Sequence, residues 1–178
     1  MAKKLLRINM TDQSYQYEEL PPPWAKWAGR GLTSAIVADE VEPTCHPLGP
    51  NNKLVIAPGW VSGTPGAPSS GRTSFGGKSP LTGTIKEANS GGLCSQKIAK
   101  LGLAAIILEG TPPKDQWFTL VIDKDGVAFD SADGLLGKGM YEVDEILWEK
   151  YPNEPALIGI GPVGEEKLSN AGVSVNDP

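Results

Sequence analysis

The first forty residues pass from strand-like to helix-like patterns of hydrophobic and polar positions. Leu5 to Ile8 is a short apolar run, Thr11 to Ser14 is a polar turn, and Tyr15 to Glu19 is a second extended segment. This order predicts a β-hairpin. Three prolines end the pattern, and from Trp24 to Asp39 the apolar residues recur at helical spacing, which predicts a helix.

The rest of the chain favours further strands joined by tight turns. Helical spacing predicts helices over Leu93 to Leu101 and Met140 to Lys150, with a short helical turn that starts near Glu165. Because strands outnumber helices, we expect one α+β domain over residues 1–178 with a mostly antiparallel sheet. The further predicted strands are Lys53 to Ala57, Thr73 to Lys78, Thr84 to Ala88, Ala104 to Glu109, Trp117 to Asp123, Val127 to Asp130, Ala156 to Gly159 and Val173 to Asn176.

Composition and charge exclude several classes of function. The chain has 16 basic and 21 acidic residues and a net charge of −5, the wrong sign for a protein that binds nucleic acid by neutralising phosphates. No apolar run approaches the length that crosses a bilayer, and the N-terminus lacks the apolar segment of a signal peptide, so we expect a cytoplasmic protein with no membrane partner. Cys45 and Cys94 lie far apart without C-x-x-C spacing, which indicates free thiols rather than a metal site or a disulfide.

Glycine and proline crowd the segment from Ala57 to Gly92. Glycine lets backbone N–H groups approach a ligand closely, and a nest of such groups binds phosphate or another anion. Arg72 would add a planar, forked cation to this nest. A long surface connection with turn glycines has the same composition, so the composition alone leaves both interpretations open.

Seven short motifs carry a more specific signal. They are Gly29-Arg30-Gly31-Leu32, Pro47 to Leu54, Ser62 to Pro65, Gly71-Arg72, Lys78 to Gly83, Asn89-Ser90-Gly91-Gly92 and Ile160 to Glu165. In sequence and in order these motifs resemble those of the aldehyde ferredoxin oxidoreductase family, whose members carry tungsten or molybdenum on two pterins. Several ordered motifs of this length rarely coincide by chance, and they cover nearly the whole chain.

The resemblance implies a fold and a cofactor site. The first domain of the family consists of two β-α-β repeats of mostly antiparallel strands, which form a barrel-like base for the bis-pterin cofactor. Arg72 resembles the arginine that contacts the pterin phosphate, and Asn89, Ser90 and Gly91 resemble the cofactor contacts beside it. The backbone oxygen of Asn89 resembles a ligand of the magnesium ion that bridges the two pterin phosphates, a role that suits a hard cation with oxygen ligands.

The same resemblance implies a function that depends on more than this chain. Family members oxidise aldehydes, or reduce acids, and exchange electrons with ferredoxin. The sequence stops before the family's second arginine- and glycine-rich pterin motif, and neither cysteine matches a cluster ligand, so we expect the iron–sulfur cluster from further domains or a partner chain. The chain is thus expected to be a metal-pterin-binding domain or subunit of an oxidoreductase that is not catalytic alone. The alternative is a non-catalytic pterin-binding or assembly module.

Two other patterns favour ordinary structural roles. Gly159, Gly161 and Gly164 satisfy the dinucleotide-binding spacing G-x-G-x-x-G. However, Pro162 removes an N–H from that loop, and no acidic residue follows about twenty positions later, so a strand-to-helix turn is favoured. His46 follows a cysteine on a loop and has no third partner nearby in sequence, so an ordinary loop is favoured over a metal site or a nucleophile with its base.

Overall fold

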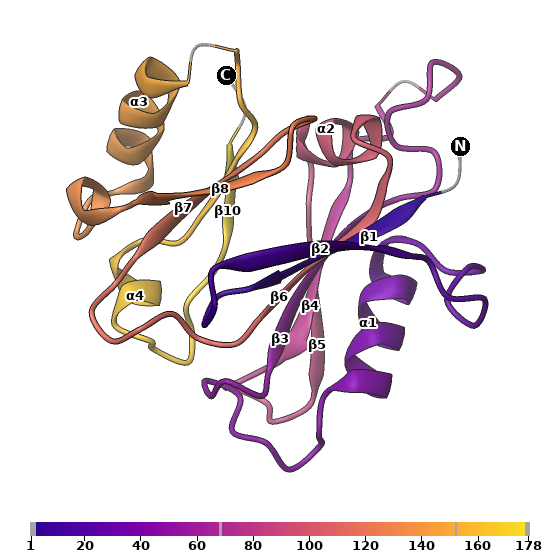
Figure 1. Ribbon diagram of the computed structural model, residues 1–178, viewed down its shortest axis with the longest axis horizontal. Coiled ribbons are helices and arrows are strands. Elements are labelled where there is room, and N and C mark those ends of the chain that lie inside the picture. Colours follow the sequence, from indigo (N-terminus) through magenta and orange to yellow (C-terminus); the bar gives the residue numbers. More distant parts are fainter. Residues whose placement is uncertain (1–2, 68, 152, 177–178) are drawn as a thin grey trace.

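Within the residues that the computed structural model describes, 3–67, 69–151 and 153–176, a six-stranded sheet forms the centre of the molecule (Figure 1). The strands are β1 (Lys4–Asn9), β2 (Ser14–Glu19), β3 (Lys53–Pro58), β4 (Thr73–Lys78), β5 (Ile85–Ser90) and β6 (Leu103–Glu109). They lie in the order β2-β1-β6-β3-β4-β5. β1 and β6 are parallel, and every other neighbouring pair is antiparallel. The expected α+β class with a mostly antiparallel sheet is therefore confirmed.

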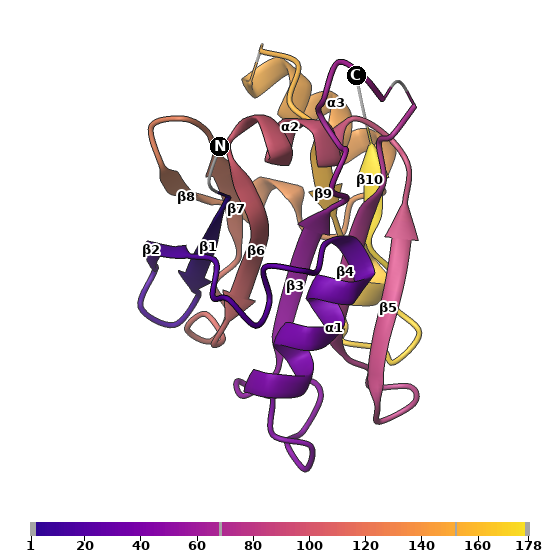
Figure 2. The ribbon, with the colours of Figure 1, turned by 90° about the vertical axis from the view of Figure 1, so that its right-hand side faces the viewer.

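The sheet separates two hydrophobic cores, because successive residues of a strand point to opposite faces. Leu5 of β1 packs with Ile36 of helix α1 (Gly29–Glu40) in the first core. Its neighbour Leu6 belongs to the second core, which helix α2 (Cys94–Lys100) also lines. Figure 2 shows α1 lying against β3 and β4. The start of α1 is thereby fixed near one end of these strands.

The C-terminal part of the chain covers the face of the sheet opposite α1 (Figure 1). Apolar side chains from its strands, among them Leu120, Phe129 and Ile158, pack against the second core. Helix α1 belongs to the first core, on the other side of the sheet. Those elements are β7 (Phe118–Ile122), β8 (Val127–Ser131), the 3-10 helix η1 (Asp133–Leu135), α3 (Met140–Lys150), β9 (Leu157–Gly159), α4 (Pro162–Glu165) and β10 (Ser174–Asn176).

Helix α1 differs from the sequence-based expectation at its start. The expected helix begins at Trp24, but the structure has turns there and a helix only from Gly29. Gly29 has a φ of +51°, a left-handed value through which a right-handed helix cannot run. Trp24 is apolar for a reason other than a helix: it is buried, and its Nε1 donates a hydrogen bond to Asp39 at 2.7 Å. None of the helices in the described ranges is long and apolar enough to span a membrane.

The central sheet is open rather than barrel-like. The chain passes twice from a strand through a helix to a strand, in β2-α1-β3 and in β5-α2-β6. Among the described strands, however, β2 and β5 each have a sheet neighbour on one side only. The expectation was a barrel-like base, and no closed barrel is found among the described strands. The expected hairpin of β1 and β2 is confirmed.

Candidate functional site

An open pocket lies where the start of α1 meets the ends of β4 and β5. Its volume is about 400 Å³. Two of the predicted cofactor-binding residues, Arg72 and Asn89, line this pocket. The full lining is Gly29, Arg30, Gly59, Arg72, Ser74 and Asn89.

A chain of hydrogen bonds crosses the floor of the pocket. The antiparallel register of β4 and β5 places Ser74 opposite Asn89. Arg72 Nε donates to Asn89 Oδ1 at 2.5 Å, and Asn89 Nδ2 donates to Ser74 Oγ at 2.8 Å. Ser74 is only 2% exposed, so the carboxamide of Asn89 is held from the protein interior. Asn89 consequently orients Arg72 at the pocket.

The other two predicted cofactor residues lie beside this chain without lining the pocket. Ser90 pairs with Thr73 at the end of the β4–β5 ladder. A Cβ atom at Gly91 would lie 3.8 Å from Nη1 of Arg72, so the backbone of Gly91 is close to the guanidinium. Ser90 and Gly91 therefore lie next to the pocket, and their role in cofactor binding stays a prediction.

Glycine is required where the two loops beside the pocket cross. A Cβ atom at Gly71 would overlap the carbonyl oxygen of Gly92. Gly92 itself has a φ of +98°, which an L side chain rarely adopts. Arg72 directly follows Gly71, and Gly91 directly precedes Gly92. The close crossing therefore fixes the backbone next to both Arg72 and Gly91. The glycines of this segment therefore serve backbone approach at this point, as an anion nest would require.

Close packing also positions the start of α1. A Cβ atom at Gly76 of β4 would lie 2.6 Å from Cβ of Thr33, so the helix lies unusually near the strand. At Gly29 an added Cβ would be 3.4 Å from Ser74 Oγ. The first residues of α1, including Arg30, are thereby brought to the hydrogen-bond chain of Ser74, Asn89 and Arg72. This tertiary contact explains why Arg30 and Ser74 were not among the predicted site residues, because no local sequence pattern contains it.

The pocket is electrostatically suited to an anion. No aspartate or glutamate lines it. Within the described ranges, neither Arg30 nor Arg72 has a carboxylate within 4.0 Å of its guanidinium. Helix α1 has no side-chain hydrogen bond from its N-cap residue, Ala28, and no acidic residue in its first turn. Its free N–H groups and its dipole add partial positive charge at the same place.

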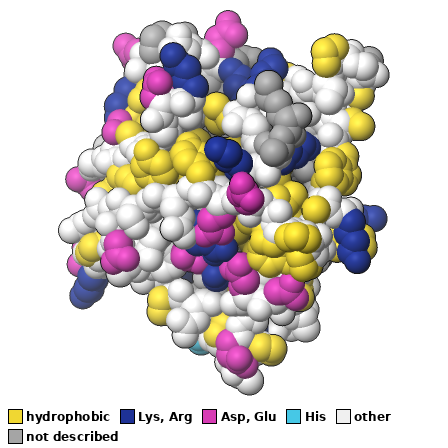
Figure 3. All heavy atoms as spheres, turned by 45° about the vertical axis from the view of Figure 1, so that its right-hand side comes forward, with side chains coloured by type: hydrophobic (Ala, Val, Ile, Leu, Met, Phe, Trp, Pro, Cys, Tyr) yellow, Lys and Arg dark blue, Asp and Glu magenta, His cyan; other side chains and the backbone are white. Residues whose placement is uncertain are grey.

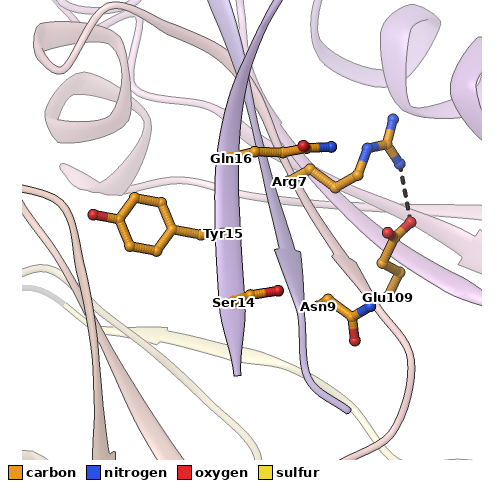
Figure 4. A pocket seen from close by; sticks show the side chains of 6 residues that line it. All are labelled: Arg7, Asn9, Ser14, Tyr15, Gln16 and Glu109. Carbon is orange, nitrogen blue, oxygen red and sulfur yellow. Dashed lines mark hydrogen bonds and ion pairs between the residues drawn. The ribbon is translucent and has the colours of Figure 1, made fainter. Parts of the chain in front are cut away.

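A second arginine-containing pocket is electrostatically different. It has a volume of about 230 Å³ and is lined by Arg7, Asn9, Ser14, Tyr15, Gln16 and Glu109 (Figure 4). Arg7 forms ion pairs with Glu18 at 2.8 Å, Glu40 at 2.9 Å and Glu109 at 3.0 Å. Lys53 also pairs with Glu40 at 2.6 Å and Glu109 at 2.8 Å. These five side chains form the Arg7 cluster, in which both cations are already neutralised.

The pKa values of the Arg7 cluster show how strongly it is paired. Burial alone would raise the pKa of Glu40, but hydrogen bonds from Arg7 and Lys53 outweigh burial and hold that pKa below its ordinary value of 4.5. The same opposition, with the same outcome, lowers the pKa of Glu109. Figure 3 shows acidic and basic side chains intermixed across the middle of one face, with hydrophobic patches on both sides. Loss of one partner from such a self-compensated cluster would leave a charge without its counterion, and the intact cluster offers little to a charged ligand.

The cysteines and the histidine lie outside the first pocket. Cys94 is buried in the second core with Phe75, on the opposite face of the sheet from α1. His46 accepts a hydrogen bond from the N–H of Leu48 at 3.2 Å and is exposed. Gly161 precedes α4, so the G-x-G-x-x-G segment forms the expected strand-to-helix turn. In the described part of the chain, no group of three or more His, Cys, Asp or Glu side chains could hold a metal ion.

The chain is similar in sequence to a known family of enzymes. The profile of the family described as aldehyde ferredoxin oxidoreductase, N-terminal domain, matches residues 5–178. The chain is 36% identical to the tungsten-containing aldehyde ferredoxin oxidoreductase of Thermococcus kodakarensis, over 98% of its own length and 29% of the relative's. It is 38% identical to the enzyme of the same description from Pyrococcus abyssi, over 97% of its own length and 28% of the relative's.

Two more distant relatives share the same domain. The chain is 29% identical to the WOR-like subunit of an aliphatic sulfonate oxidoreductase from Pyrococcus furiosus, over 96% of its own length and 29% of that subunit's. Among solved structures, the active site complex BamBC of benzoyl coenzyme A reductase with 1,5-dienoyl-CoA has a TM-score of 0.89, at 28% identity. That match covers 98% of this chain and 27% of the other. The chain thus spans less than a third of the length of these relatives.

Proposed function

Since the chain belongs to the aldehyde ferredoxin oxidoreductase family, we propose that it is the cofactor-binding N-terminal domain of a tungsten- or molybdenum-pterin oxidoreductase. The observation that carries this proposal is the acid-free pocket in which Arg72 is oriented by Asn89 but has no carboxylate partner within 4.0 Å in the described part of the chain. An oriented, unpaired guanidinium is suited to a phosphate, which it can bind through two parallel hydrogen bonds. The open sheet and α1 serve as the base on which the cofactor rests.

The residues of the pocket fit different parts of the cofactor's phosphate end. Arg72 would bind phosphate oxygens, and the backbone of Ser90 and Gly91 would approach the same group. The side-chain oxygen of Asn89 already accepts a hydrogen bond from Arg72. A magnesium ion would therefore take the backbone oxygen of Asn89, together with phosphate oxygens, as hard ligands.

The varied names of the relatives support a shared role in cofactor binding. The matching domain occurs in proteins described for aldehydes, aliphatic sulfonates and benzoyl coenzyme A. A domain that occurs in proteins with such different substrates is expected to bind the cofactor that these proteins share rather than the substrate. When bound, the metal-pterin group would supply the two-electron redox chemistry, while this chain binds and orients it.

The complete reaction requires more than this chain. Because the chain spans 29% of the length of the Thermococcus relative, we assign the substrate site and the iron–sulfur cluster to further domains or a partner chain. The proposed reaction is oxidation of an aldehyde, or reduction of an acid, with ferredoxin as electron partner. A non-catalytic pterin-binding or assembly module is the other outcome that the experiment below distinguishes.

The test is elemental analysis combined with native mass spectrometry on the protein purified without oxygen from its own cells. We expect tungsten or molybdenum and phosphorus to co-purify with the wild type, and a cysteine-bearing chain or segment to accompany them. Arg72→Gln should lose metal and phosphorus together. Lys86→Gln, which removes an exposed positive charge from β5 outside the pocket, is the matched control and should retain both.

The possible results separate the hypotheses. Equal metal and phosphorus in the Arg72→Gln and Lys86→Gln proteins would contradict the assigned site. Metal and pterin without any cluster-bearing chain or segment would favour the non-catalytic module. Wild-type protein free of metal and phosphorus would contradict cofactor binding altogether.

A further inference from the structure

The three arginines of the chain, Arg7, Arg30 and Arg72, are divided unevenly between its two pockets. Arg7 is surrounded by three carboxylates. Arg30 and Arg72 line one acid-free pocket, and in the described ranges no ion pair joins either of them to a carboxylate. In a chain with 21 acidic residues, this pocket therefore keeps two guanidinium charges that no carboxylate of the described residues neutralises, and such charges attract anions.

Arg30 reaches this pocket from a different element than Arg72 does. It is the second residue of α1, whereas Arg72 directly precedes β4. The close contact of Gly76 with Thr33 sets the helix against the sheet. Through this packing the helix start lies beside Ser74, which is hydrogen-bonded to Asn89 and through it to Arg72. The two cations are thus held on separate rigid elements around a common polar floor.

We propose that Arg30 is a second phosphate-binding residue of this pocket, which binds the same phosphate monoester dianion as Arg72. This inference rests on the proposed cofactor site and adds a residue to it. Two guanidinium groups match the two charges of a phosphate monoester, and the N–H groups at the start of α1 add further donors. A single carboxylate from a partner protein would neutralise only one of the two arginines.

The two arginines differ in whether a neighbouring side chain orients the guanidinium. Asn89 orients Arg72 before a ligand arrives, whereas Arg30 is exposed and its guanidinium has no such hydrogen-bond partner within the described ranges. Arg30 is therefore expected to contribute mainly through charge and Arg72 through both charge and geometry. Replacement by lysine distinguishes these roles, because lysine keeps the charge but not the planar fork.

The experiment is a titration of the full chain with inorganic phosphate, followed by isothermal titration calorimetry and by amide chemical shifts, at constant ionic strength. Arg30→Gln and Arg72→Gln should each weaken phosphate binding roughly tenfold, as expected for loss of a charge-assisted hydrogen bond. Arg30→Lys should retain most of the affinity, and Arg72→Lys should lose more of it. Lys26→Gln removes a positive charge just before α1 and outside the pocket, and it should change the affinity less than about twofold.

The outcomes separate this inference from the proposed function. If Arg30→Gln binds phosphate as tightly as Lys26→Gln while Arg72→Gln does not, Arg30 is not a phosphate ligand and the pocket assignment stands. If the wild type shows no phosphate-dependent shifts around Arg72, both proposals fail. Unchanged amide spectra of the variants outside the pocket confirm that each protein is folded.

Discussion

The Arg7 cluster and the pocket of Arg30 and Arg72 present the same side-chain type in opposite electrostatic settings. The side chain of Arg7 is 13% exposed, and its guanidinium contacts three carboxylates. No carboxylate lines the pocket of Arg30 and Arg72, and Glu87 lies beside it, where it accepts a hydrogen bond from Asn89 Nδ2 at 3.5 Å. A paired arginine holds elements together, whereas an unpaired arginine that is held in place is available to a ligand. In this domain, the partners of an arginine, rather than its presence, therefore distinguish a structural site from a proposed binding site.

The largest expected effect is on stability at the Arg7 cluster. Arg7→Met should lower the free energy of unfolding by about 3 kcal/mol, because it removes one cation from three partly buried carboxylates and leaves Glu18 without its ion pair. Urea unfolding monitored by circular dichroism measures this loss. Arg30→Met is the matched control at the other site, and it should cost less than about 0.5 kcal/mol because the side chain is exposed. Equal losses in the two variants would contradict the distinction.

The next largest effect concerns the loop crossing beside Arg72. Gly71→Ala places a Cβ atom against the Gly92 carbonyl oxygen, and we expect a loss of roughly 1–3 kcal/mol together with weaker phosphate binding. Unfolding experiments and phosphate titration measure the two effects. Gly66→Ala is the control, because a Cβ atom there meets nothing within 4 Å. An alanine at residue 71 without either effect would mean that the crossing does not position the pocket.

The Arg7 cluster should also make stability depend on acid. The pKa values of Glu40 and Glu109 lie below the ordinary 4.5 in the folded protein. Lowered carboxyl pKa values contribute stability that is present above the unfolded-state pKa and is lost as pH falls through the folded-state pKa. The difference in unfolding free energy between the wild type and Arg7→Met should therefore shrink as pH falls below 4.5. The difference between the wild type and Arg30→Met should stay nearly constant over the same range, and a parallel decrease would contradict the assignment.

The smallest expected effect separates the side chain of Asn89 from its backbone. Asn89→Ala removes the hydrogen bond that orients Arg72 but keeps the backbone oxygen proposed for magnesium. Phosphate affinity should fall about threefold, with a stability loss near 1 kcal/mol. Asn51→Ala, an exposed loop position, provides the same substitution away from both pockets. A loss of affinity equal to that of Arg72→Gln would show that the side chain has a larger role than orientation.

Local sequence patterns predict the regular elements of this domain well. The predicted bounds of β4 and α3, Thr73 to Lys78 and Met140 to Lys150, agree with the structure, because hydrophobic spacing and β-propensity act over a few residues. The predicted start of α1 was wrong, because Trp24 is buried by a tertiary contact and Gly29 adopts a left-handed φ. A single-sequence pattern contains neither of these facts.

The two arginine sites were predictable to different degrees. Motif resemblance pointed to Arg72 and Asn89, and in the structure their side chains are joined by a hydrogen bond. Arg30 joins them only because α1 packs closely on Gly76, a contact that no local pattern encodes. The Arg7 cluster was not predicted, because its ion pairs join residues as far apart as Arg7 and Glu109, 102 positions along the chain. Its carboxylates come together only when the sheet order is known.

The most direct test of the central claim is a crystal structure of the protein purified without oxygen from its own cells, with diffraction recorded above the tungsten and molybdenum absorption edges. We predict a metal-pterin group whose phosphate lies in the pocket of Gly29, Arg30, Gly59, Arg72, Ser74 and Asn89, within hydrogen-bond distance of Arg72. A metal-pterin group bound elsewhere, or a partner carboxylate paired with Arg72 in place of phosphate, would contradict the claim.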